Sequence, residues 1–159
     1  MTLTDSPRTI TVVRETFDSV VEDIAPLLDE HWKELALFKD EIPLNVDWNQ
    51  YRRGYEGGRV RAYGVRDEGV LVGYAVFSVL ERHAHYAHRW AVNDVIWIAP
   101  KYRNFGVGTL LCETFERDLR LSGPIVIHIE TKLHAPALAA LLQSRDYSPV
   151  GPSFAKRIE

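Results

Sequence analysis

A glycine-bearing turn carries the clearest chemical signal in the sequence. The run I-A-P-K-Y-R-N-F-G-V-G ends at Gly108 and leads directly into a patterned amphipathic segment. Glycines allow a close approach between backbone and ligand, and the first N–H groups of a helix have no partner within it. Such a helix start attracts anions, so the turn predicts a pyrophosphate cradle to which Arg103 adds a positive charge; the alternative is a simple strand-to-helix connection.

A carboxylate interrupts the apolar run that precedes this turn. Asp94 stands directly before V-I-W-I, and a charged side chain at such a place requires a reason. Either it is a general base held beside a reacting group, or it is a strand-end aspartate bonded to the backbone or to Arg89. Glu130, at the end of the next apolar run, is the second candidate for the base, and His128 and Glu34 follow it.

Three histidines and one cysteine add little chemistry of their own. His83, His85 and His88 lie close together, but no cysteine or evident carboxylate partner joins them. Their spacing fits no compact zinc signature, so we expect no metal site and instead a polar loop in which His85 contacts a substrate. Cys112 lies beside the apolar face of an expected helix, where a buried thiol is favoured over a nucleophile.

Alternating or continuous apolar segments predict the strands that position these residues. A tight-turn sequence ending in Gly69 joins two of them into the clearest hairpin, and the last two close the fold around a Gly-Pro pair. The expected strands span 9–14, 60–65, 70–80, 91–98, 124–130, 147–150 and 154–158.

Segments with apolar residues at helical spacing predict the helices between the strands. Thr16 is a suitable N-cap for the first, which Pro26 either kinks or divides into two helices. A short amphipathic piece at 47–55 follows, and then helices over 108–121 and 135–142. These elements predict a fold of the α/β (α+β) class in a single domain, 1–159, whose first eight residues form a loose leader.

Composition narrows the classes of function. The 159 residues carry a formal net charge of -3 and a single cysteine. This charge gives no broad basic surface, so nucleic acid is a disfavoured partner. The sequence contains no run of membrane-spanning length and no secretory segment, so we expect a cytoplasmic protein without a membrane partner. Residues 15–47 are strongly acidic, as in a solvated helix face or in a lobe that attracts a cationic acceptor.

The run A-P-K-Y-R-N-F-G-V-G resembles motif A of the GNAT superfamily of N-acetyltransferases, in which R/Q-x-x-G-x-G/A follows a strand. The expected order of elements is also similar to the GNAT order, so the resemblance covers nearly the whole chain. It implies a mixed central sheet of about six to seven strands, with flanking helices and a splayed cleft for acetyl-CoA. The runs H-Y-x-x-R-W-A-V-N-D and H-W-K-E are similar to those of phage and prophage GNATs, which would place the protein in a host cytoplasm.

The resemblance also implies roles for single residues. Asp94 lies at a position similar to that of the catalytic glutamate of polyamine-type GNATs, with Glu130 as the alternative base. The resemblance implies three kinds of contact to acetyl-CoA. The strand before the turn would contact it through its backbone, the motif would hold the pyrophosphate, and His134 would replace a common asparagine. The residues expected to contact acetyl-CoA are Ile96, Trp97, Ile98, Arg103, Asn104, Phe105, Gly106, Val107, Gly108 and His134. Contacts to the acceptor are expected from His31, Glu34, Trp48, Tyr51 and His85.

The implied activity is acetyl transfer from acetyl-CoA to a primary amine of a small molecule or protein. Many GNATs carry a tyrosine that protonates the leaving thiolate, and a leucine stands at that position here. The thiolate therefore either takes its proton from another group or leaves without a side-chain acid. Alternatively, the protein is a CoA-binding or protein-interaction module with little or no catalysis. A further alternative is an acceptor amine on nucleic acid or aminoacyl-tRNA. Five arginines give this alternative some support: Arg52, Arg53, Arg59, Arg61 and Arg66. Homodimers are common in the superfamily, so a homodimer is a further expectation.

Overall fold

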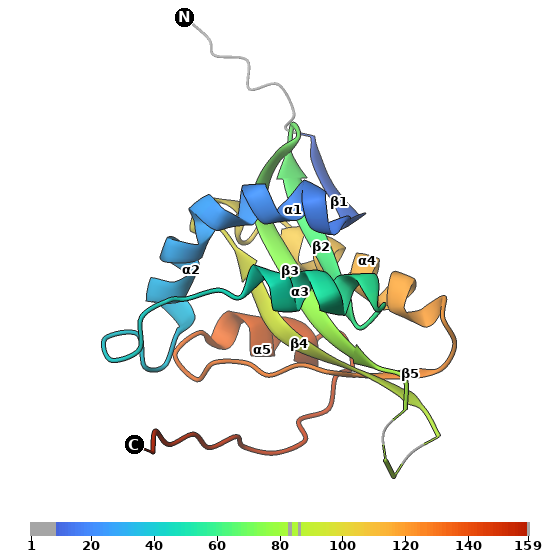
Figure 1. Cartoon of the computed structure of the whole chain (residues 1–159). Coiled ribbons are helices and arrows are strands. Elements are labelled where there is room, and N and C mark those ends of the chain that lie inside the picture. Colours follow the sequence, from blue (N-terminus) through green and yellow to red (C-terminus); the bar gives the residue numbers. More distant parts are fainter. Residues whose placement is uncertain (1–8, 83, 86, 159) are drawn as a thin grey trace, which may run out of the picture.

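A five-stranded sheet forms the centre of the molecule (Figure 1). The computed structural model describes residues 9–82, 84–85 and 87–158, so the expected leader and His83 lie outside the described residues. The first four strands pair antiparallel with their neighbours and the fifth joins the fourth in parallel, which confirms the predicted mixed sheet. In spatial order the strands are β1 (Ile10–Glu15), β2 (Val60–Asp67), β3 (Val70–Leu80), β4 (Arg89–Ile98) and β5 (Ile125–His128).

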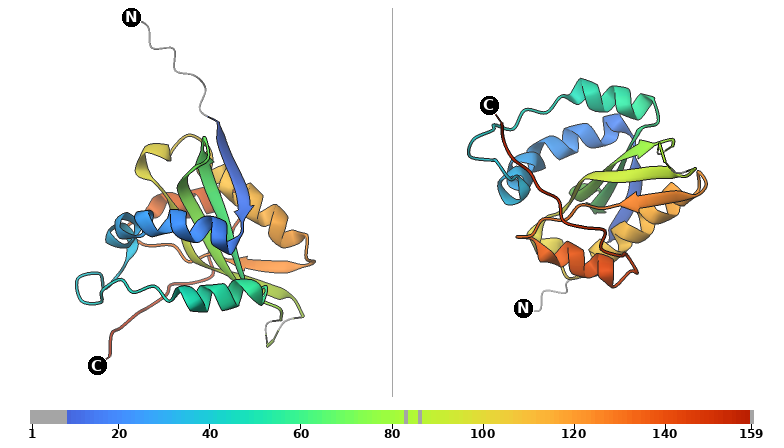
Figure 2. Two further views of the ribbon diagram at one scale, coloured as in Figure 1. Left: turned by 45° about the horizontal axis from the view of Figure 1, so that its top comes forward. Right: turned by 90° about the horizontal axis from the view of Figure 1, so that it is seen from below.

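Helices cover both faces of the sheet (Figures 1 and 2). Pro26 lies in a short 3-10 turn, Ala25–Leu27, so the predicted first helix is divided into two. No helix in the described part of the chain is long and apolar enough to span a membrane. The first face carries α1 (Phe17–Ile24), α2 (Leu28–Leu35) and α3 (Trp48–Glu56), and the second carries α4 (Val107–Arg120) and α5 (Pro136–Gln143).

The central strand β3 is buried on both of its faces and divides the core into two clusters. Tyr74 and Val76 pack toward α1 to α3, whereas Ala75 and Phe77 pack toward α4 and α5. Cys112 of α4 lies in the second cluster, where burial raises the pKa of its thiol to about 12. The thiol is therefore buried and unreactive at neutral pH, as the apolar face of the helix predicted.

The two predicted closing strands are wrong, and the sheet has five strands rather than six to seven. Residues 148–158 are exposed and pair with no strand, and Phe154 is 93% exposed. Each apolar piece is short, and Pro152 between them removes a donor that a ladder would need. The segment instead leaves α5 and runs across the lower side of the molecule (Figure 2), where Arg157 pairs with Glu41 at 3.0 Å.

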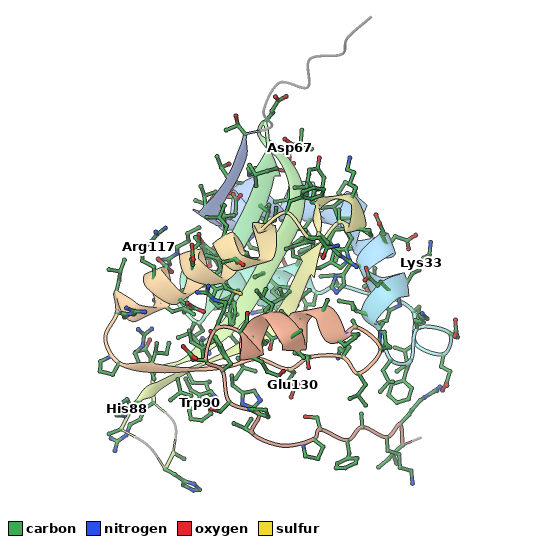
Figure 3. The ribbon with its side chains drawn as sticks, turned by 180° about the vertical axis from the view of Figure 1, so that it is seen from behind. Lys33, Asp67, His88, Trp90, Arg117 and Glu130 are labelled. Carbon is green, nitrogen blue, oxygen red and sulfur yellow. The ribbon has the colours of Figure 1, made fainter. Side chains whose placement is uncertain are left out.

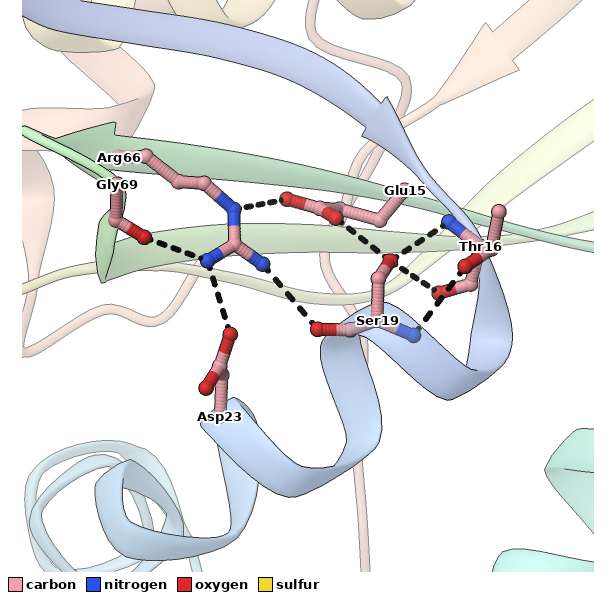
Figure 4. A network of polar contacts seen from close by, with 6 residues as sticks. All are labelled: Glu15, Thr16, Ser19, Asp23, Arg66 and Gly69. Atoms are coloured by element: carbon pink, nitrogen blue, oxygen red, sulfur yellow. Dashed lines mark hydrogen bonds and ion pairs between the residues drawn. The ribbon is translucent and has the colours of Figure 1, made fainter.

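A polar network fixes the start of α1 against the sheet (Figure 4). The predicted cap is confirmed, because the backbone N–H of Ser19 donates to Thr16 Oγ1 at 3.2 Å. Arg66 of β2 donates from Nε to Glu15 Oε1 at 2.6 Å and from NH1 to Asp23 Oδ2 at 2.8 Å. The end of β1, the first helix and the β2–β3 hairpin are thereby held together on the face that carries the cleft described next.

Candidate functional site

A cleft of about 600 Å³ opens where β4 and β5 diverge. The two strands pair only as far as Val92 and His128. Just beyond this point the register between β3 and β4 shifts, because Phe77 lies opposite Asn93 and Val76 opposite Val95. Asp94 is therefore the extra residue of a β-bulge, which bends a strand and ends its pairing. The resemblance implied a splayed cleft, and the bulge with the short β5 accounts for it.

Beyond the bulge, β4 presents alternate backbone groups to the open edge. The N–H of Ala99 donates to the carbonyl of Val72 on β3 at 2.9 Å, so by alternation Trp97 also directs its backbone toward β3. Ile96 and Ile98 then direct their N–H and carbonyl groups toward the cleft. Two of the three backbone positions expected to contact a cofactor, Ile96 and Ile98, thus face the cleft. The backbone of Trp97 faces β3, and its side chain belongs to the core cluster of Tyr74 and Val76.

The glycine turn brings the start of α4 to the same cleft. Gly106 is the N-cap residue and has a φ of 74°, in the left-handed region, and no side chain caps the helix. Asn104 is also left-handed, with a φ of 69°. Arg103, Asn104, Gly106 and Gly108 line the cleft, whereas Phe105 points to solvent at 78% exposure and Val107 is buried in the core. The uncapped N–H groups and the positive end of the helix dipole suit an anionic ligand.

Arg103, expected to contact a pyrophosphate, forms a two-pronged ion pair with Glu34 of α2. Its NH1 and NH2 donate to Glu34 Oε1 and Oε2, both at 2.7 Å, and its Nε donates to the carbonyl of Ile98 at 2.8 Å. Trp97 Nε1 also donates to Glu34 Oε2 at 2.8 Å. The hydrogen bond from Arg103 outweighs burial and holds the pKa of Glu34 below its ordinary value. The Glu34 carboxylate is therefore charged and fully engaged.

His134, expected beside the cofactor, lies on the same joint between α2 and the rest of the fold. Its Nε2 donates to the backbone carbonyl of Glu34 at 3.0 Å. The end of α2 is thus bonded to the turn before α4 and to the segment before α5. His134 itself does not line the cleft.

Asp94 and four aromatic or imidazole side chains line the part of the cleft beside α2 and α3. Tyr51 of α3 donates its hydroxyl hydrogen to Asp94 Oδ2. His31 Nδ1 and the hydroxyl of Tyr74 are hydrogen-bonded at 2.8 Å. Trp48 packs beside Tyr51 with ring centroids 6.1 Å apart. The four elements α2, α3, β3 and β4 therefore bring polar groups to one place, as required for handling a proton.

Burial sets the protonation of these groups. Burial lowers the pKa of His31 despite the nearby charges of Asp94 and Glu34, so its imidazole is neutral at pH 7. Burial, followed by the hydrogen bond to Asp94, raises the pKa of Tyr51. Burial likewise raises the pKa of Tyr74, so both tyrosine hydroxyls keep their protons. Asp94, which is exposed, accepts a hydrogen bond from the Tyr51 hydroxyl.

The structure places both candidate bases and excludes the ion pair with Arg89 that was one alternative role for Asp94. Arg89 does not pair with Asp94, because its Nε lies 3.7 Å from Glu81 and its NH1 donates to the carbonyl of Ser122 at 3.2 Å. Glu130 also lines the cleft, and Ser153 donates to its Oε1 at 3.5 Å. Asp94 and Glu130 therefore stand on the two sides of the opening between β4 and β5.

Some expected residues lie elsewhere. His85 is in the loop after β3 and does not line the cleft, and His128 stacks on Trp90 with ring centroids 6.4 Å apart. Figure 3 shows Trp90 and His88 on the opposite side of the view from Lys33 of α2. Among the residues described, no three histidine, cysteine or carboxylate side chains are grouped to hold a metal.

Sequence reasoning missed two polar residues of the site. Tyr74 lies in a continuous apolar run, where an aromatic ring is expected in the core, but it lines the cleft and its hydroxyl is hydrogen-bonded to His31. Asn93 next to the bulge was also missed, since nothing in the sequence marks where a strand will bulge. Leu141 lines the cleft against Gly108, so the leucine that replaces the usual tyrosine offers no acid there.

Comparisons with known proteins agree with this geometry. The model of the acetyltransferase (GNAT) family matches residues 21–145. The fold is similar to that of the aminoglycoside N-acetyltransferase AAC(6')-Iy in complex with CoA (TM-score 0.76, 13% identity, 98% of this chain and 99% of that chain). It is also similar to a ribosomal-protein-alanine N-acetyltransferase from Brucella melitensis biovar Abortus 2308 (TM-score 0.70, 16% identity, 95% of this chain and 100% of that chain). A third similar structure is the aminoglycoside acetyltransferase meta-AAC0020 from an uncultured soil metagenomic sample, in complex with sisomicin (TM-score 0.75, 10% identity, 94% of this chain and 97% of that chain). A search of curated proteins gave no match.

Proposed function

Because the chain belongs to the acetyltransferase (GNAT) family, we propose that it transfers an acetyl group from acetyl-CoA directly to a primary amine of a small molecule or protein. The observation that carries this proposal is that the uncapped start of α4 and the carboxylate of Asp94 line the same cleft. One end of the cleft suits an anionic donor, and the other suits a cationic acceptor.

The donor half fits acetyl-CoA in charge and in shape. The N–H groups at Gly106 to Gly108 would hold the pyrophosphate, and the open backbone of Ile96 with the N–H of Ile98, whose carbonyl already accepts from Arg103, would pair with the amide groups of the pantetheine arm. Structures similar in fold contain acetyl-CoA or CoA, which supports the same ligand here. When bound, acetyl-CoA supplies the thioester whose C–S bond breaks as the C–N bond of the product forms.

Asp94 serves as the base in this proposal. An alkyl ammonium has a pKa of about 10.4, so about one molecule in a thousand is a free amine at neutral pH. The Asp94 carboxylate attracts the ammonium and accepts its proton, directly or through one water. Tyr51 holds the carboxylate in place through its hydroxyl, and a backbone N–H of the open edge stabilises the charge that develops on the acetyl oxygen.

The part of the cleft that contains Asp94, Tyr51 and His31, where the acceptor would bind, favours a cation. Its lining includes the carboxylates of Asp94 and Glu130 against one lysine, Lys132, while Glu34 and Arg103 neutralise each other. Two of the similar structures are named as aminoglycoside acetyltransferases and one as a ribosomal-protein-alanine acetyltransferase, so both polyamine-like molecules and protein amines are suitable acceptors to test.

The arginines that would support a nucleic-acid acceptor are largely engaged in ion pairs. Arg61 pairs with Asp118 at 3.1 Å and Arg66 pairs with Glu15 at 2.6 Å. This leaves a non-catalytic CoA-binding module as the second candidate, because Leu141 removes the usual hydroxyl from the cleft.

Release of the CoA thiol tests the proposal. The protein is incubated with acetyl-CoA and a panel of a diamine, an aminoglycoside, a lysine peptide and a peptide with a free N-terminal alanine. We expect thiol release above the blank with at least one amine, and an acetylated product of matching mass. Binding of CoA without thiol release for any amine would favour the binding module.

A further inference from the structure

The side chain of Asn93 bridges β4 and the segment that follows β5. Its Oδ1 accepts a hydrogen bond from the backbone N–H of Glu130 at 2.7 Å, and its Nδ2 donates to the backbone carbonyl of Glu130 at 3.2 Å. One carboxamide thus satisfies both polar backbone groups of one residue, as the backbone of a paired strand would.

Only one orientation of this amide is compatible with both contacts. The opposite orientation would place the NH2 group against an N–H and the oxygen against a carbonyl. Among side chains of this size, only asparagine carries a donor and an acceptor on one planar group. Aspartate offers acceptors alone, and leucine offers neither.

The bridge stands at the fork of the sheet. Val92 and His128 form the last pair between β4 and β5, and the bulge at Asp94 follows immediately. In the continued parallel register Asn93 would lie opposite Ile129, but its side chain reaches one residue further, to Glu130. The ladder therefore does not simply fray, because a longer, side-chain link replaces the backbone link at the point of opening.

We propose that Asn93 is a positioning residue that sets the spacing of β4 and the segment after β5 at the inner end of the cleft. The proposal rests on the proposed function, since this spacing matters only if a ligand enters there. The bridge keeps β4 joined to the segment after β5 where the strands separate, and it leaves the backbone of Ile96 and the N–H of Ile98 open. It also gives Asp94, its chain neighbour, and Glu130 a common anchor.

A variant without hydrogen-bonding groups tests the bridge. Asn93→Leu has nearly the same size but cannot make either contact to the Glu130 backbone, so the spacing at the cleft is no longer fixed and we expect about tenfold weaker binding of CoA by calorimetry. Tyr63→Phe is the matched control, because it removes a hydrogen bond of 2.7 Å to Asp118 away from the cleft. The control is expected to lose stability in thermal unfolding and to keep wild-type affinity for CoA.

The variant Asn93→Asp gives a readout that a merely structural role would not move. Its carboxylate keeps the acceptor for the Glu130 N–H but faces the Glu130 carbonyl with a second acceptor. Protonation restores a donor, so CoA affinity relative to the wild type is expected to be lowest at pH 7 and to recover as the pH falls toward about 4–5.

The outcomes separate this proposal from the proposed function. If the wild type binds CoA and Asn93→Leu binds it equally well, or if the relative affinity of Asn93→Asp is the same at all pH values, Asn93 has no positioning role. If the wild type binds no CoA at all, the proposed function falls, and the role of Asn93 falls with it.

Discussion

Glu34 and Arg103 form a two-pronged ion pair at one end of the cleft, with two N–O distances of 2.7 Å. The side chains are 29% and 35% exposed, so water screens the pair only in part. The pair joins α2, whose His31 lines the cleft, to the turn that leads into α4. The arginine of the glycine-bearing motif is thus tied to the helix that carries the proposed acceptor contact His31.

The ion pair predicts a specific loss of stability in acid. The pKa of Glu34 in the fold lies below its ordinary value of 4.5, so its contribution is present above pH 4.5 and is lost as the pH falls through the lowered value. Glu34→Gln cannot show this loss. We expect the difference in free energy of unfolding between wild type and variant, measured with urea, to shrink below pH 4.5.

The titration of His31 is coupled to that of Glu34, because the Glu34 charge opposes the lowering of the His31 pKa by burial. The pKa of His31 is lowered from 6.5, so the fold loses stability as the pH falls below 6.5 in both proteins. A pH-independent difference between wild type and Glu34→Gln down to pH 3 would contradict the role of the ion pair.

Gly106 predicts a graded series of substitutions at the start of α4. At a φ of 74°, an alanine costs about 1–2 kcal/mol, and asparagine tolerates the left-handed region better. Apart from its own chain neighbours, no atom of the described residues lies within 4 Å of the added Cβ, so the loss reflects backbone strain. In urea unfolding we expect stability to fall in the order glycine, asparagine, alanine, with CoA affinity in the same order; equal stability of all three would refute this account.

Gly64 predicts a steric conflict in the network shown in Figure 4. A Cβ at this position would lie 2.2 Å from Glu15 Oε1 and 2.9 Å from Leu71 Cδ1. Gly64→Ala must therefore displace the Glu15–Arg66 pair, and we expect a loss of about 1–3 kcal/mol in the free energy of unfolding.

A double-mutant cycle locates the cause of that loss. In a Glu15→Ala background the carboxylate is absent, so adding Gly64→Ala should cost less than in the wild type. Additive effects would show that the strain arises elsewhere, and the close contact would then not limit this position.

The fold was largely predictable because its main elements are strongly patterned. The β2–β3 hairpin, the helix after the glycine turn and an interruption of the first helix at Pro26 follow from periodicity and from breakers at Gly69 and Pro26, although the sequence left open whether Pro26 kinks or divides that helix. The closing strands were not predictable in the same way. Alternation over four or five residues indicates a strand only if a partner edge is available, and residues 148–158 have none in the described structure.

The site was predictable in its residue types and less so in its contacts. Asp94, Glu34, Tyr51 and Arg103 line one cleft, but their partners depend on tertiary geometry that a single sequence does not encode locally. The bulge that turns Asp94 toward α3 is one example. The distance that lets Arg103 reach Glu34, which is 69 residues away in the sequence, is another.

The most direct test of the central claim compares turnover of the wild type and Asp94→Asn with acetyl-CoA and the best amine acceptor. Loss of the base predicts a fall in kcat of about 10²–10⁴-fold, with nearly unchanged affinity for CoA, whereas Glu130→Gln should affect mainly the KM of the acceptor. Wild-type kcat in Asp94→Asn would contradict the account, because proton transfer would then not pass through the carboxylate on the bulge.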